Sequence, residues 1–374
     1  MELHKKIKGK ISIGQRAEIK DIKDLSMLYT PGVARPSEDI KKNPELVYDL
    51  TIKRNTVAVV TDGTRVLGLG DIGPEAALPV MEGKALIMKQ FADLDAFPIC
   101  LKCRSAEEIV EVVKCIEPVF GAINLEDIET PKVFEIEEKL IEELNIPVFH
   151  DDQHGTAIVT LAGLINALKL VEKKKEKIKV GIVGAGSAGY AIAKLLSAYG
   201  IEHMVVFDSK GAIGKHRKDL PKYKQNIADI TNKDNFTGGI KDFMEADVII
   251  GASSPGTIPE ETIRNMNMDS IVFAMANPIP EISEEQAKEW GVEIFGTGRS
   301  DWKNQINNAV CFPGFLRALL DLRIVKITDE IKIAAAEGIA NTLTEKELSK
   351  DKIVPDVFDE RVVGNIKKAI ESAI

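Results

Sequence analysis

The sequence lacks three features that would assign a protein to a membrane, to the cell exterior or to nucleic acid. No apolar run reaches the roughly 18 residues that are needed to cross a bilayer. The basic N-terminal segment MELHKKIKGK has no apolar stretch behind it, as a secretory signal would. Positive charge is not in excess either, because the formal net charge is -9, whereas nucleic-acid binders usually carry a basic surface. We therefore expect a cytoplasmic protein that binds neither nucleic acid nor membranes.

Cysteine is also scarce, with four residues in a chain of 374. Cys100 and Cys103 form a single C-x-x-C, and a zinc site normally needs a second pair of ligands. Reduced structural thiols are the simpler interpretation, and a redox or metal role for this pair stays open. What the chain does have is a hydrophobic share of 44%, which is typical of globular proteins with a sizeable core. Its length is enough for two domains.

The order of the predicted elements indicates an α/β fold. Residues 1–50 read as an irregular, partly helical arm. The next part alternates apolar strands and amphipathic helices, with strands at 56–61 and 96–101 and two short ones ending near Asn124 and Phe149, and helices at 75–92, 106–115 and 133–144. We place an N-terminal α/β domain at residues 1–155.

A second alternating series follows the first. The apolar segment 156–171 reads as a helix, and the strands after it lie at 178–183, 204–208, 247–251 and 271–276. Alternation of this kind builds a doubly wound parallel sheet. We therefore place a Rossmann-type nucleotide-binding domain at residues 156–374. Its helices after about residue 311 are expected to pack back across the domains.

A glycine-rich turn follows the first strand of that domain. The turn consists of Gly184, Ala185, Gly186, Ser187, Ala188 and Gly189. The G-x-G-x-x-G pattern is weak alone, but here a strand precedes it, a helix follows it and Asp208 ends the next strand, which is the context that dinucleotide binding requires. The glycines allow a tight turn, close approach of the backbone to a pyrophosphate, and close packing of the helix on the strand. A purely structural turn is the alternative.

The choice between NAD and NADP stays open at this point. Asp208 is placed to accept hydrogen bonds from the adenosine ribose hydroxyls, which favours NAD. A basic cluster lies just beyond it, in Ser209, Lys210, Lys215, His216 and Arg217. These residues suit the 2′-phosphate of NADP, and a solvated loop is the alternative. We expect a weak preference for NAD.

Two acidic pairs follow neighbouring strands of the first domain, Glu126-Asp127 and Asp151-Asp152. A strand–helix–strand crossover makes parallel strands, so both pairs are expected at one edge of the sheet. Such crowding of negative charge is unfavourable without a cation. Carboxylate oxygens suit Mg²⁺ or Mn²⁺ better than zinc. The alternative is a set of helix N-caps and solvated turns.

Two further side chains have acid–base potential. Lys84 lies in an otherwise apolar helical stretch, where desolvation would lower its pKa and make it a base near neutrality. A surface lysine whose stem covers apolar neighbours is the alternative. Tyr29 precedes Thr30-Pro31-Gly32 and is able to donate a proton, with a core tyrosine as the alternative.

Several segments together resemble the malic enzymes, in their short prokaryotic form. They are, in chain order, LYTPGVA (28–34), TDGTRVLGLGDIGPEAALPVMEGKA (61–85), INLEDI (123–128), VFHDDQHGTA (148–157), ANPIPEI (276–282) and TGRSDWKNQINNAV (297–310). The resemblance spans nearly the whole chain and makes the N-terminal α/β domain the catalytic one. It implies the metal-dependent oxidation of (S)-malate by NAD or NADP, with decarboxylation to pyruvate and CO₂. Decarboxylation of oxaloacetate and a homodimer are expected with it.

The same resemblance implies roles for single residues. Tyr29 is similar to the family's proton donor, Lys84 to its general base and substrate contact, and Asp151 to a residue that tunes or orients the lysine. The implied metal ligands are Glu126, Asp127 and Asp152. In the homodimer Tyr29 is expected to reach the neighbour's site.

Substrate contacts are implied in the same way. Arg65 is similar to an arginine that binds a substrate carboxylate, for which its fork of donors is suited. Asn277 and Asn308 are similar to asparagines that contact substrate or nicotinamide. The rival interpretations are an amino-acid dehydrogenase, which would not need the metal carboxylates, and a non-catalytic nucleotide-binding regulator.

Overall fold

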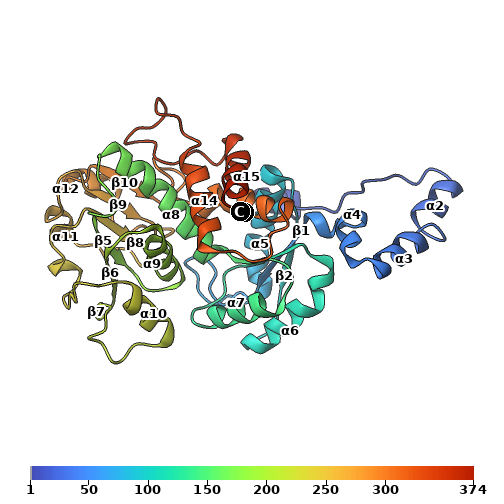
Figure 1. The fold of residues 1–374 in the computed structure, drawn as a ribbon, viewed down its shortest axis with the longest axis horizontal. Coiled ribbons are helices and arrows are strands. Elements are labelled where there is room, and N and C mark those ends of the chain that lie inside the picture. The colour runs from blue at the N-terminus through green and yellow to red at the C-terminus, as the bar shows by residue number, and fades with distance from the viewer. Residues whose placement is uncertain (1) are drawn as a thin grey trace.

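The computed structural model describes residues 2–374 as an arm and two α/β lobes (Figure 1). The arm carries the short helices α1 (Glu2–Ile7), α2 (Ile22–Leu28), α3 (Ala34–Lys42) and α4 (Val47–Leu50), and none of their residues is buried. In Figure 1, α2 and α3 extend away from the two lobes, whereas Lys10 and Arg16 lie against the first lobe and donate hydrogen bonds to Glu82 and Asp95. The partly helical arm predicted from the sequence is therefore present, and its own side chains form no core.

The first lobe is built on a parallel sheet in the order β2-β1-β3-β4. Its strands are β1 (Thr56–Thr61), β2 (Asp95–Cys100), β3 (Ala122–Leu125) and β4 (Val148–His150). β1 is the apolar run TVAVVT, and every residue of it is buried. Alternate side chains of this strand enter two different cores, because neighbouring residues of a strand point to opposite faces.

Helices cover both faces of this sheet. They are α5 (Pro74–Ala92), α6 (Ala106–Ile116) and α7 (Lys132–Glu143). α6 and α7 share one core with Ala58 and Val60, whereas α5 shares the other with Val57 and Val59. The predicted crossover is confirmed, since α7 connects β3 to β4 and these two strands pair in parallel.

The next helix, α8 (Asp151–Leu170), corrects one prediction. We placed its start at residue 156, but it begins at Asp151, directly after β4. Asp151 and Asp152 therefore occupy the first turn of a helix, where its positive N-terminal end favours carboxylates. The domain boundary that we placed after residue 155 falls within this continuous helix.

The second lobe has a sheet in the order β10-β9-β8-β5-β6-β7, parallel except for the last pair. Its strands are β5 (Lys179–Val183), β6 (His203–Asp208), β7 (Gly211–Ala212), β8 (Val248–Gly251), β9 (Ile271–Ala274) and β10 (Ile294–Thr297). Its helices are α9 (Ser187–Tyr199), α10 (Lys222–Ile230), α11 (Glu260–Arg264) and α12 (Glu284–Trp290). The Rossmann-type fold is confirmed, and β7 and β10 are strands that the sequence analysis did not predict.

Three C-terminal helices join the lobes, as predicted. They are α13 (Phe312–Asp321), α14 (Asp329–Ala340) and α15 (Arg361–Ala373). α13 packs on α5 of the first lobe, α14 packs on α8, and α15 packs on both α13 and α14. One buried core consequently runs through both lobes.

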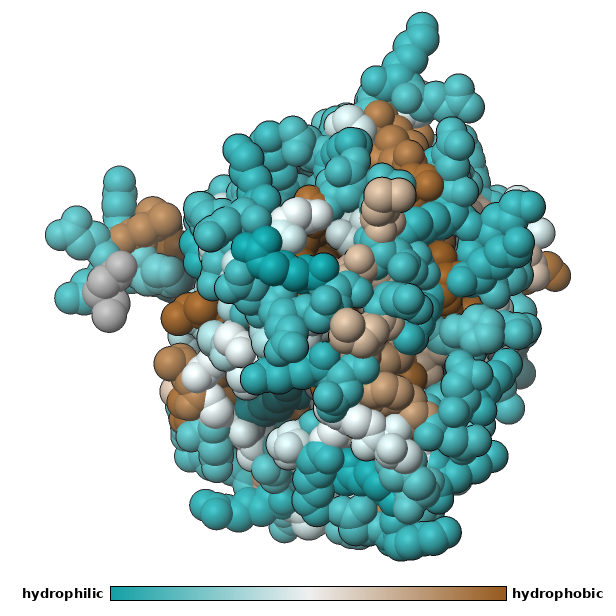
Figure 2. All heavy atoms as spheres, turned by 90° about the vertical axis from the view of Figure 1, so that its left-hand side faces the viewer, coloured by the Kyte–Doolittle hydropathy of each residue, from teal (hydrophilic) through white to brown (hydrophobic). Residues whose placement is uncertain are grey.

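The end of the molecule formed by the second lobe is mainly hydrophilic. Figure 2 shows its apolar residues in small, separate groups among polar ones. Single exposed apolar side chains are ordinary on protein surfaces. Across residues 2–374, no helix combines the length and the apolar character that a membrane crossing requires.

Candidate active site

A cleft of about 610 Å³ lies between the two lobes. Eight of the residues singled out in the sequence line it, namely Arg65, Lys84, Glu126, Asp127, Asp152, Ala188, Asn277 and Asn308. They come from both lobes, and the strand ends and helix starts that carry them are far apart in sequence. The carboxylates of the first lobe and Ala188 and Asn277 of the second lobe therefore line the same cleft.

The acidic edge forms a compact cluster. Glu126 and Asp127 directly follow β3, and Asp152 lies in the first turn of α8. One carboxylate oxygen from each of the three lies within 4.8 Å of the others. The backbone N–H of Asp127 donates to Asp152 Oδ2 at 3.1 Å, and Asn124 Nδ2 donates to Glu126 Oε2 at 2.9 Å. Glu126 and Asp127 are buried, so the alternative of solvated turns is wrong for this pair.

The charges of this cluster are not balanced by the protein. Burial raises the pKa of Glu126 well above its usual range, with Lys84 opposing and Asp152 reinforcing the rise. Burial and then Asp152 raise the pKa of Asp127 to about 7. Asp127 Oδ2 is buried and has no hydrogen-bond partner among the described residues. A divalent cation would supply both the missing charge and the missing partner, so these side chains fit the predicted metal site.

Asp152 differs from its two neighbours. Burial alone would raise its pKa, but the ring of His150 and the ammonium of Lys84 lower the pKa to about 2. His150 Nε2 lies 3.4 Å from Asp152 Oδ2. Asp152 is therefore the member of the cluster that is most firmly ionised in the protein alone.

Lys84 is enclosed by carboxylates. Its side chain is only 11% exposed, and its ammonium contacts Asp151 and lies 3.1 Å from Glu126 Oε1. The ring of Phe312 lies against it, with the centroid 4.3 Å from Nζ. The surface-lysine alternative is thus wrong, and so is the predicted direction of its pKa. Burial does act to lower the pKa, but Asp151 and Glu126 outweigh it and hold the pKa above its usual range.

Asp151 is fully buried behind the cleft wall. Its Oδ2 accepts a hydrogen bond from Asn308 Nδ2 at 2.7 Å as well as the contact from Lys84. Asn308 begins the short helix η5 (Asn308–Val310). A Cβ on Gly155, one turn along α8, would lie 1.9 Å from Asp151 Oδ1. The glycine of the DDQHG segment therefore leaves room for the carboxylate that fixes Lys84 in place.

The nucleotide side of the cleft meets the requirements of the glycine-rich turn. Gly184 has φ of 119°, and a Cβ there would lie 2.3 Å from the carbonyl oxygen of Ala252. A Cβ on Gly189 would lie 2.0 Å from the carbonyl oxygen of Gly184. The turn opens α9 at Ser187, so the helix N-terminus is available to a phosphate. A side chain at either glycine would disrupt this tight turn, which has the form that suits a dinucleotide.

Asp208 lies outside the cleft lining and already accepts three hydrogen bonds within the protein. Its side chain is 7% exposed. It accepts hydrogen bonds from Arg217 Nη1 at 2.7 Å, from Lys224 Nζ at 2.6 Å and from the backbone of Lys210 at 2.9 Å. Burial would raise its pKa, but these donors lower it. Arg217 of the predicted basic cluster is therefore not a solvated loop residue. Lys224, which the sequence analysis did not single out, completes the set from α10.

Some of the remaining residues lie as predicted and others do not. Arg65 faces the glycine-rich turn, since a Cβ on Gly186 would lie 4.0 Å from its Nη2. Asn277 Nδ2 approaches the carbonyl oxygen of Gly298 at 3.5 Å. Tyr29, by contrast, is 64% exposed at the end of α2 in the arm and does not line the cleft. The core-tyrosine alternative is wrong, and the single chain keeps Tyr29 away from Lys84.

The sequence analysis missed contacts that depend on tertiary structure. Thr130 Oγ1 and Ser187 Oγ share a hydrogen bond of 2.5 Å, which links the first lobe to the glycine-rich turn. His150 and Asn124 support carboxylates of the acidic cluster. The only sequence signal for these two was their position within one or two residues of a predicted ligand.

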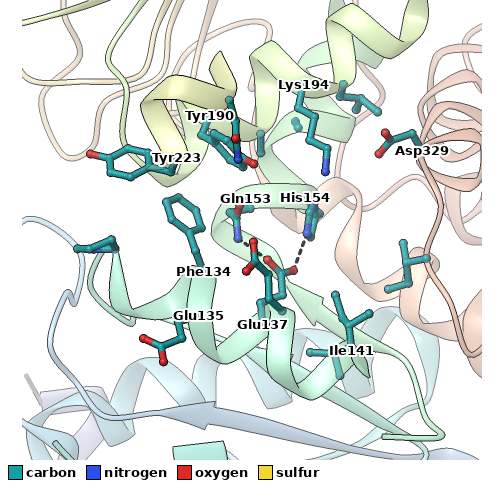
Figure 3. Close-up of a pocket in the computed structure, with 18 of the residues that line it drawn as sticks. Phe134, Glu135, Glu137, Ile141, Gln153, His154, Tyr190, Lys194, Tyr223 and Asp329 are labelled. Atoms are coloured by element: carbon teal, nitrogen blue, oxygen red, sulfur yellow. Dashed lines mark hydrogen bonds and ion pairs between the residues drawn. The ribbon is translucent and has the colours of Figure 1, made fainter. Parts of the chain in front are cut away.

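A second cavity, of about 830 Å³, lies between α7, α9, α10 and α14 (Figure 3). At its floor, Glu137 of α7 accepts a hydrogen bond from Gln153 at 2.7 Å and pairs with His154 at 2.6 Å, as the dashed lines in Figure 3 show. Burial acts to raise the pKa of Glu137, but His154 lowers it to about 2. The first turn of α8, which also carries Asp151 and Asp152, is thus held by Glu137 of α7.

Two domain descriptions of one protein family match most of the chain. The family description "malic enzyme, N-terminal domain" matches residues 8–141, and "malic enzyme, NAD binding domain" matches residues 153–371. The chain is 54% identical over 368 residues to an NAD-dependent malic enzyme of Geobacillus stearothermophilus, which covers 98% of this chain and 77% of that one. It is 53% identical to a bifunctional malic/malolactic enzyme of Bacillus subtilis, over 100% of this chain and 92% of that one.

The fold agrees with the sequence comparison. The crystal structure of an NAD-dependent malic enzyme from Thermotoga maritima superposes with a TM-score of 0.95 and is 47% identical. The match covers 99% of this chain and 98% of that chain. Both lobes and their relative arrangement are therefore shared with that enzyme.

Proposed function

Because the chain belongs to the malic enzyme family, we propose that it oxidises (S)-malate with NAD or NADP and decarboxylates the product to pyruvate and CO₂ in a reaction that needs Mg²⁺ or Mn²⁺. It is an NAD(P)-dependent malic enzyme with an NAD-binding domain of the family type. One observation carries the proposal. Lys84, enclosed by Asp151 and Glu126, shares a cleft with an acidic cluster that is short of positive charge.

The metal and the cofactor are assigned to opposite sides of this cleft. Glu126, Asp127 and Asp152 would hold the divalent cation, and the turn from Gly184 to Gly189 would hold the cofactor's pyrophosphate. When bound, the cation polarises the C2 oxygen and the C1 carboxylate of malate, and the nicotinamide accepts hydride from C2. Arg65 binds a malate carboxylate, and Asn277 and Asn308 contact substrate or nicotinamide.

Lys84 takes the proton from the C2 hydroxyl. In the protein alone Asp151 and Glu126 hold a proton on this lysine. A cation held by Glu126 would engage the charge that supports the ammonium form, which would lower the pKa of Lys84 and favour its role as a base. Asp151 orients the amino group of Lys84 before and after it takes the proton, because Asn308 fixes the Asp151 carboxylate in place. The same residues serve oxaloacetate, so we include its decarboxylation in the proposal.

Tyr29 supplies the proton to C3 of enolpyruvate from the partner subunit of a homodimer. Two features of the arm support this arrangement. Tyr29 lies outside the cleft of its own chain, and exposed apolar side chains surround it on α2, including Ile22, Met27 and Leu28. An arm without buried residues of its own gains stability by covering such side chains on a second copy. A cytoplasmic location also belongs to the proposal, and the four free thiols suit a reducing compartment.

The activity is tested by absorbance of reduced nicotinamide with malate, Mn²⁺ and NAD or NADP in turn. Turnover is expected with malate, is expected to stop when EDTA is added, and should return with excess Mn²⁺. Turnover of an amino acid without added metal would instead indicate an amino-acid dehydrogenase. Cofactor binding without any turnover of malate would indicate a regulator.

The partner's contribution is tested by mixing two inactive variants. In a hybrid dimer of Tyr29→Phe and Lys84→Ala chains, an exchanged tyrosine gives one site that has both Lys84 and Tyr29. Random mixing should then restore about a quarter of the wild-type activity, since half of the dimers are hybrids and each has one complete site. In a control, a chain that carries both changes is mixed equally with wild type. Its hybrids have no complete site, so the activity should fall to about a quarter, whereas action within one chain would leave about half. If mixing the single variants restores nothing, while size measurements show hybrid dimers, Tyr29 acts within its own chain or not at all.

A further inference from the structure

Two loops of the second lobe form one wall of the cleft. The first follows β8 and contributes Ser253 and Ser254 to the lining, and the second follows β9 and contributes Ala276 and Asn277. Both loops are irregular. Backbone hydrogen bonds join them from the N–H of Met275 to the oxygen of Gly251 and from the N–H of Gly256 to the oxygen of Glu281. Side-chain contacts supply the rest of the connection between them.

Glu281 joins these loops through its carboxylate. Its Oε1 accepts a hydrogen bond from the backbone N–H of Ser253 at 2.8 Å, and its Oε2 accepts one from the backbone N–H of Ala276 at 3.1 Å. The backbone oxygen of Glu281 also accepts the N–H of Gly256 at 2.9 Å. One residue thus takes up N–H groups at three points along the wall, two of them through its side chain.

The structure around Glu281 leaves room for this carboxylate and for little else. Glu281 is 2% exposed. A Cβ on Gly251, the last residue of β8, would lie 2.5 Å from Glu281 Cδ. Glu281 does not line the cleft but a smaller cavity of about 490 Å³ on the other side of the wall. The carboxylate therefore acts from behind the wall and touches neither substrate nor metal ligands.

We propose that Glu281 is a positioning residue for the nicotinamide cofactor, because its carboxylate ties the Ser253 loop and the Ala276 loop into one surface. Ala276 is the immediate neighbour of Asn277, so the bond to Oε2 also sets the place of that side chain in the cleft. A buried glutamate that accepts two backbone N–H groups is a charge-assisted brace, and such bonds are among the stronger ones in proteins. The inference rests on the proposed function, since it assumes that a nicotinamide cofactor binds at this wall.

The test is Glu281→Gln, measured with NADH fluorescence, steady-state kinetics and thermal unfolding. The amide keeps one acceptor oxygen but turns an NH₂ group toward the second N–H, so one loop is released. We expect the Kd for NADH and the KM for the oxidised cofactor to rise by about tenfold, as for the loss of a buried bond to a charged acceptor. The affinity for Mn²⁺, followed by electron paramagnetic resonance, should stay within about twofold because the proposed metal ligands belong to the first lobe.

Three further variants separate positioning from general stability. Glu289→Gln removes an exposed carboxylate of the same segment and should change nothing. Gly251→Ala leaves the charge of Glu281 in place but displaces its carboxylate, and should weaken NADH binding as Glu281→Gln does. Glu281→Asp keeps the charge on a shorter side chain and replaces Glu281→Gln if the latter does not fold. It should also bind NADH more weakly, since its carboxylate is too short to hold both loops.

The outcomes distinguish this inference from the proposed function. If the wild-type enzyme oxidises malate and Glu281→Gln binds NADH as tightly as wild type does, the inference is overturned and the function stands. A variant with a lower melting temperature, unchanged NADH affinity and equal losses in all kinetic constants would overturn it too, as the sign of a purely structural role. If the wild-type enzyme does not bind NADH, both the function and the inference fail.

Discussion

Two carboxylate sites follow parallel strands in this molecule, and the protein treats them in opposite ways. Around Asp208, Arg217 and Lys224 supply two cations to one carboxylate, and the pKa of Asp208 falls. In the acidic cluster of the first lobe, Lys84 is the one ammonium among residues 2–374 that pairs with these carboxylates, and the pKa of Asp127 rises to about 7. Both sites have carboxylates at the carboxyl ends of parallel strands. Positive charge exceeds negative charge around Asp208, whereas negative charge is in excess in the acidic cluster.

The difference separates a site that is complete from one that is not. Asp208 has its donors inside the protein and needs nothing further to be stable as an anion. In the acidic cluster, Asp127 Oδ2 is buried and receives no hydrogen bond from the part of the chain that the structure describes, and burial raises the pKa of Glu126 as well. Buried charge of this kind is costly unless something from solution compensates it. The imbalance, rather than the presence of aspartates, is what points to a metal.

The largest effect is expected from a change in the incomplete site. Asp152→Asn should lower kcat/KM for malate by at least about 1000-fold, because the several kcal/mol that a metal contributes to charge stabilisation are lost. Mn²⁺ binding, followed by electron paramagnetic resonance, should weaken in parallel. The NADH affinity should not change, since the glycine-rich turn belongs to the other lobe. Asp229→Asn, at an exposed position on α10, serves as the control. Near-normal turnover with metal still required would remove Asp152 from the ligand set.

The sequence could predict the ends of strands but not the balance of charge around them. The runs that became β1, β3, β5 and β6 are apolar and β-branched, so their carboxyl ends and the residues after them were readable. The glycine-rich turn was readable for the same reason, because its context is local. These features placed Glu126, Asp127 and Asp208 correctly at the strand ends.

What the sequence could not supply were contacts between distant residues. The pKa of Lys84 depends on Asp151, which is 67 residues away, so burial alone suggested the wrong direction. Lys224 reaches Asp208 from a separate helix, α10. The start of α8 was misplaced because its first turn is polar, although aspartates are favoured there. The sequence around Tyr29 likewise could not show that this residue is exposed and lies outside the cleft of its own chain.

A smaller effect is expected at the complete site. Asp208→Asn should shift the ratio of kcat/KM for NAD over NADP by about tenfold toward NADP, on the order of 1.4 kcal/mol. The change removes an acceptor for the ribose hydroxyls and frees Arg217 and Lys224, whose cations suit a 2′-phosphate. In Asp208→Asn/Arg217→Ala the gain with NADP should largely disappear. A wild-type preference for NADP of tenfold or more would show that the basic residues already dominate, and that Asp208 does not select NAD.

The smallest effects concern stability, and the change in melting temperature should have opposite signs for substitutions at the two sites. In EDTA at pH 8, Asp127→Asn should raise the melting temperature by about 2–4 °C, because it removes one of several crowded negative charges. Under the same conditions Asp208→Asn should lower it by about 2–8 °C, since two cations lose their partner. Scanning fluorimetry measures both changes. Excess Mn²⁺ should stabilise the wild type and reverse the order of the wild type and Asp127→Asn, because binding to the native state adds stability that the variant cannot gain.

The pH dependence of the Asp208 effect follows from the sign of its pKa shift. The pKa of Asp208 is lower in the folded protein than its ordinary value of 3.8. Its ionised form therefore contributes stability that is fully present above pH 3.8 and is lost as the pH falls through the folded value. The loss of melting temperature in Asp208→Asn should accordingly be constant between pH 8 and pH 5 and become smaller only below about pH 4. If the difference in melting temperature already disappears near pH 6, a histidine and not this carboxylate is responsible for it. If Asp127→Asn and Asp208→Asn change the melting temperature in the same direction in EDTA, the two sites do not differ in charge balance. The physical argument for a metal in the acidic cluster would then fail.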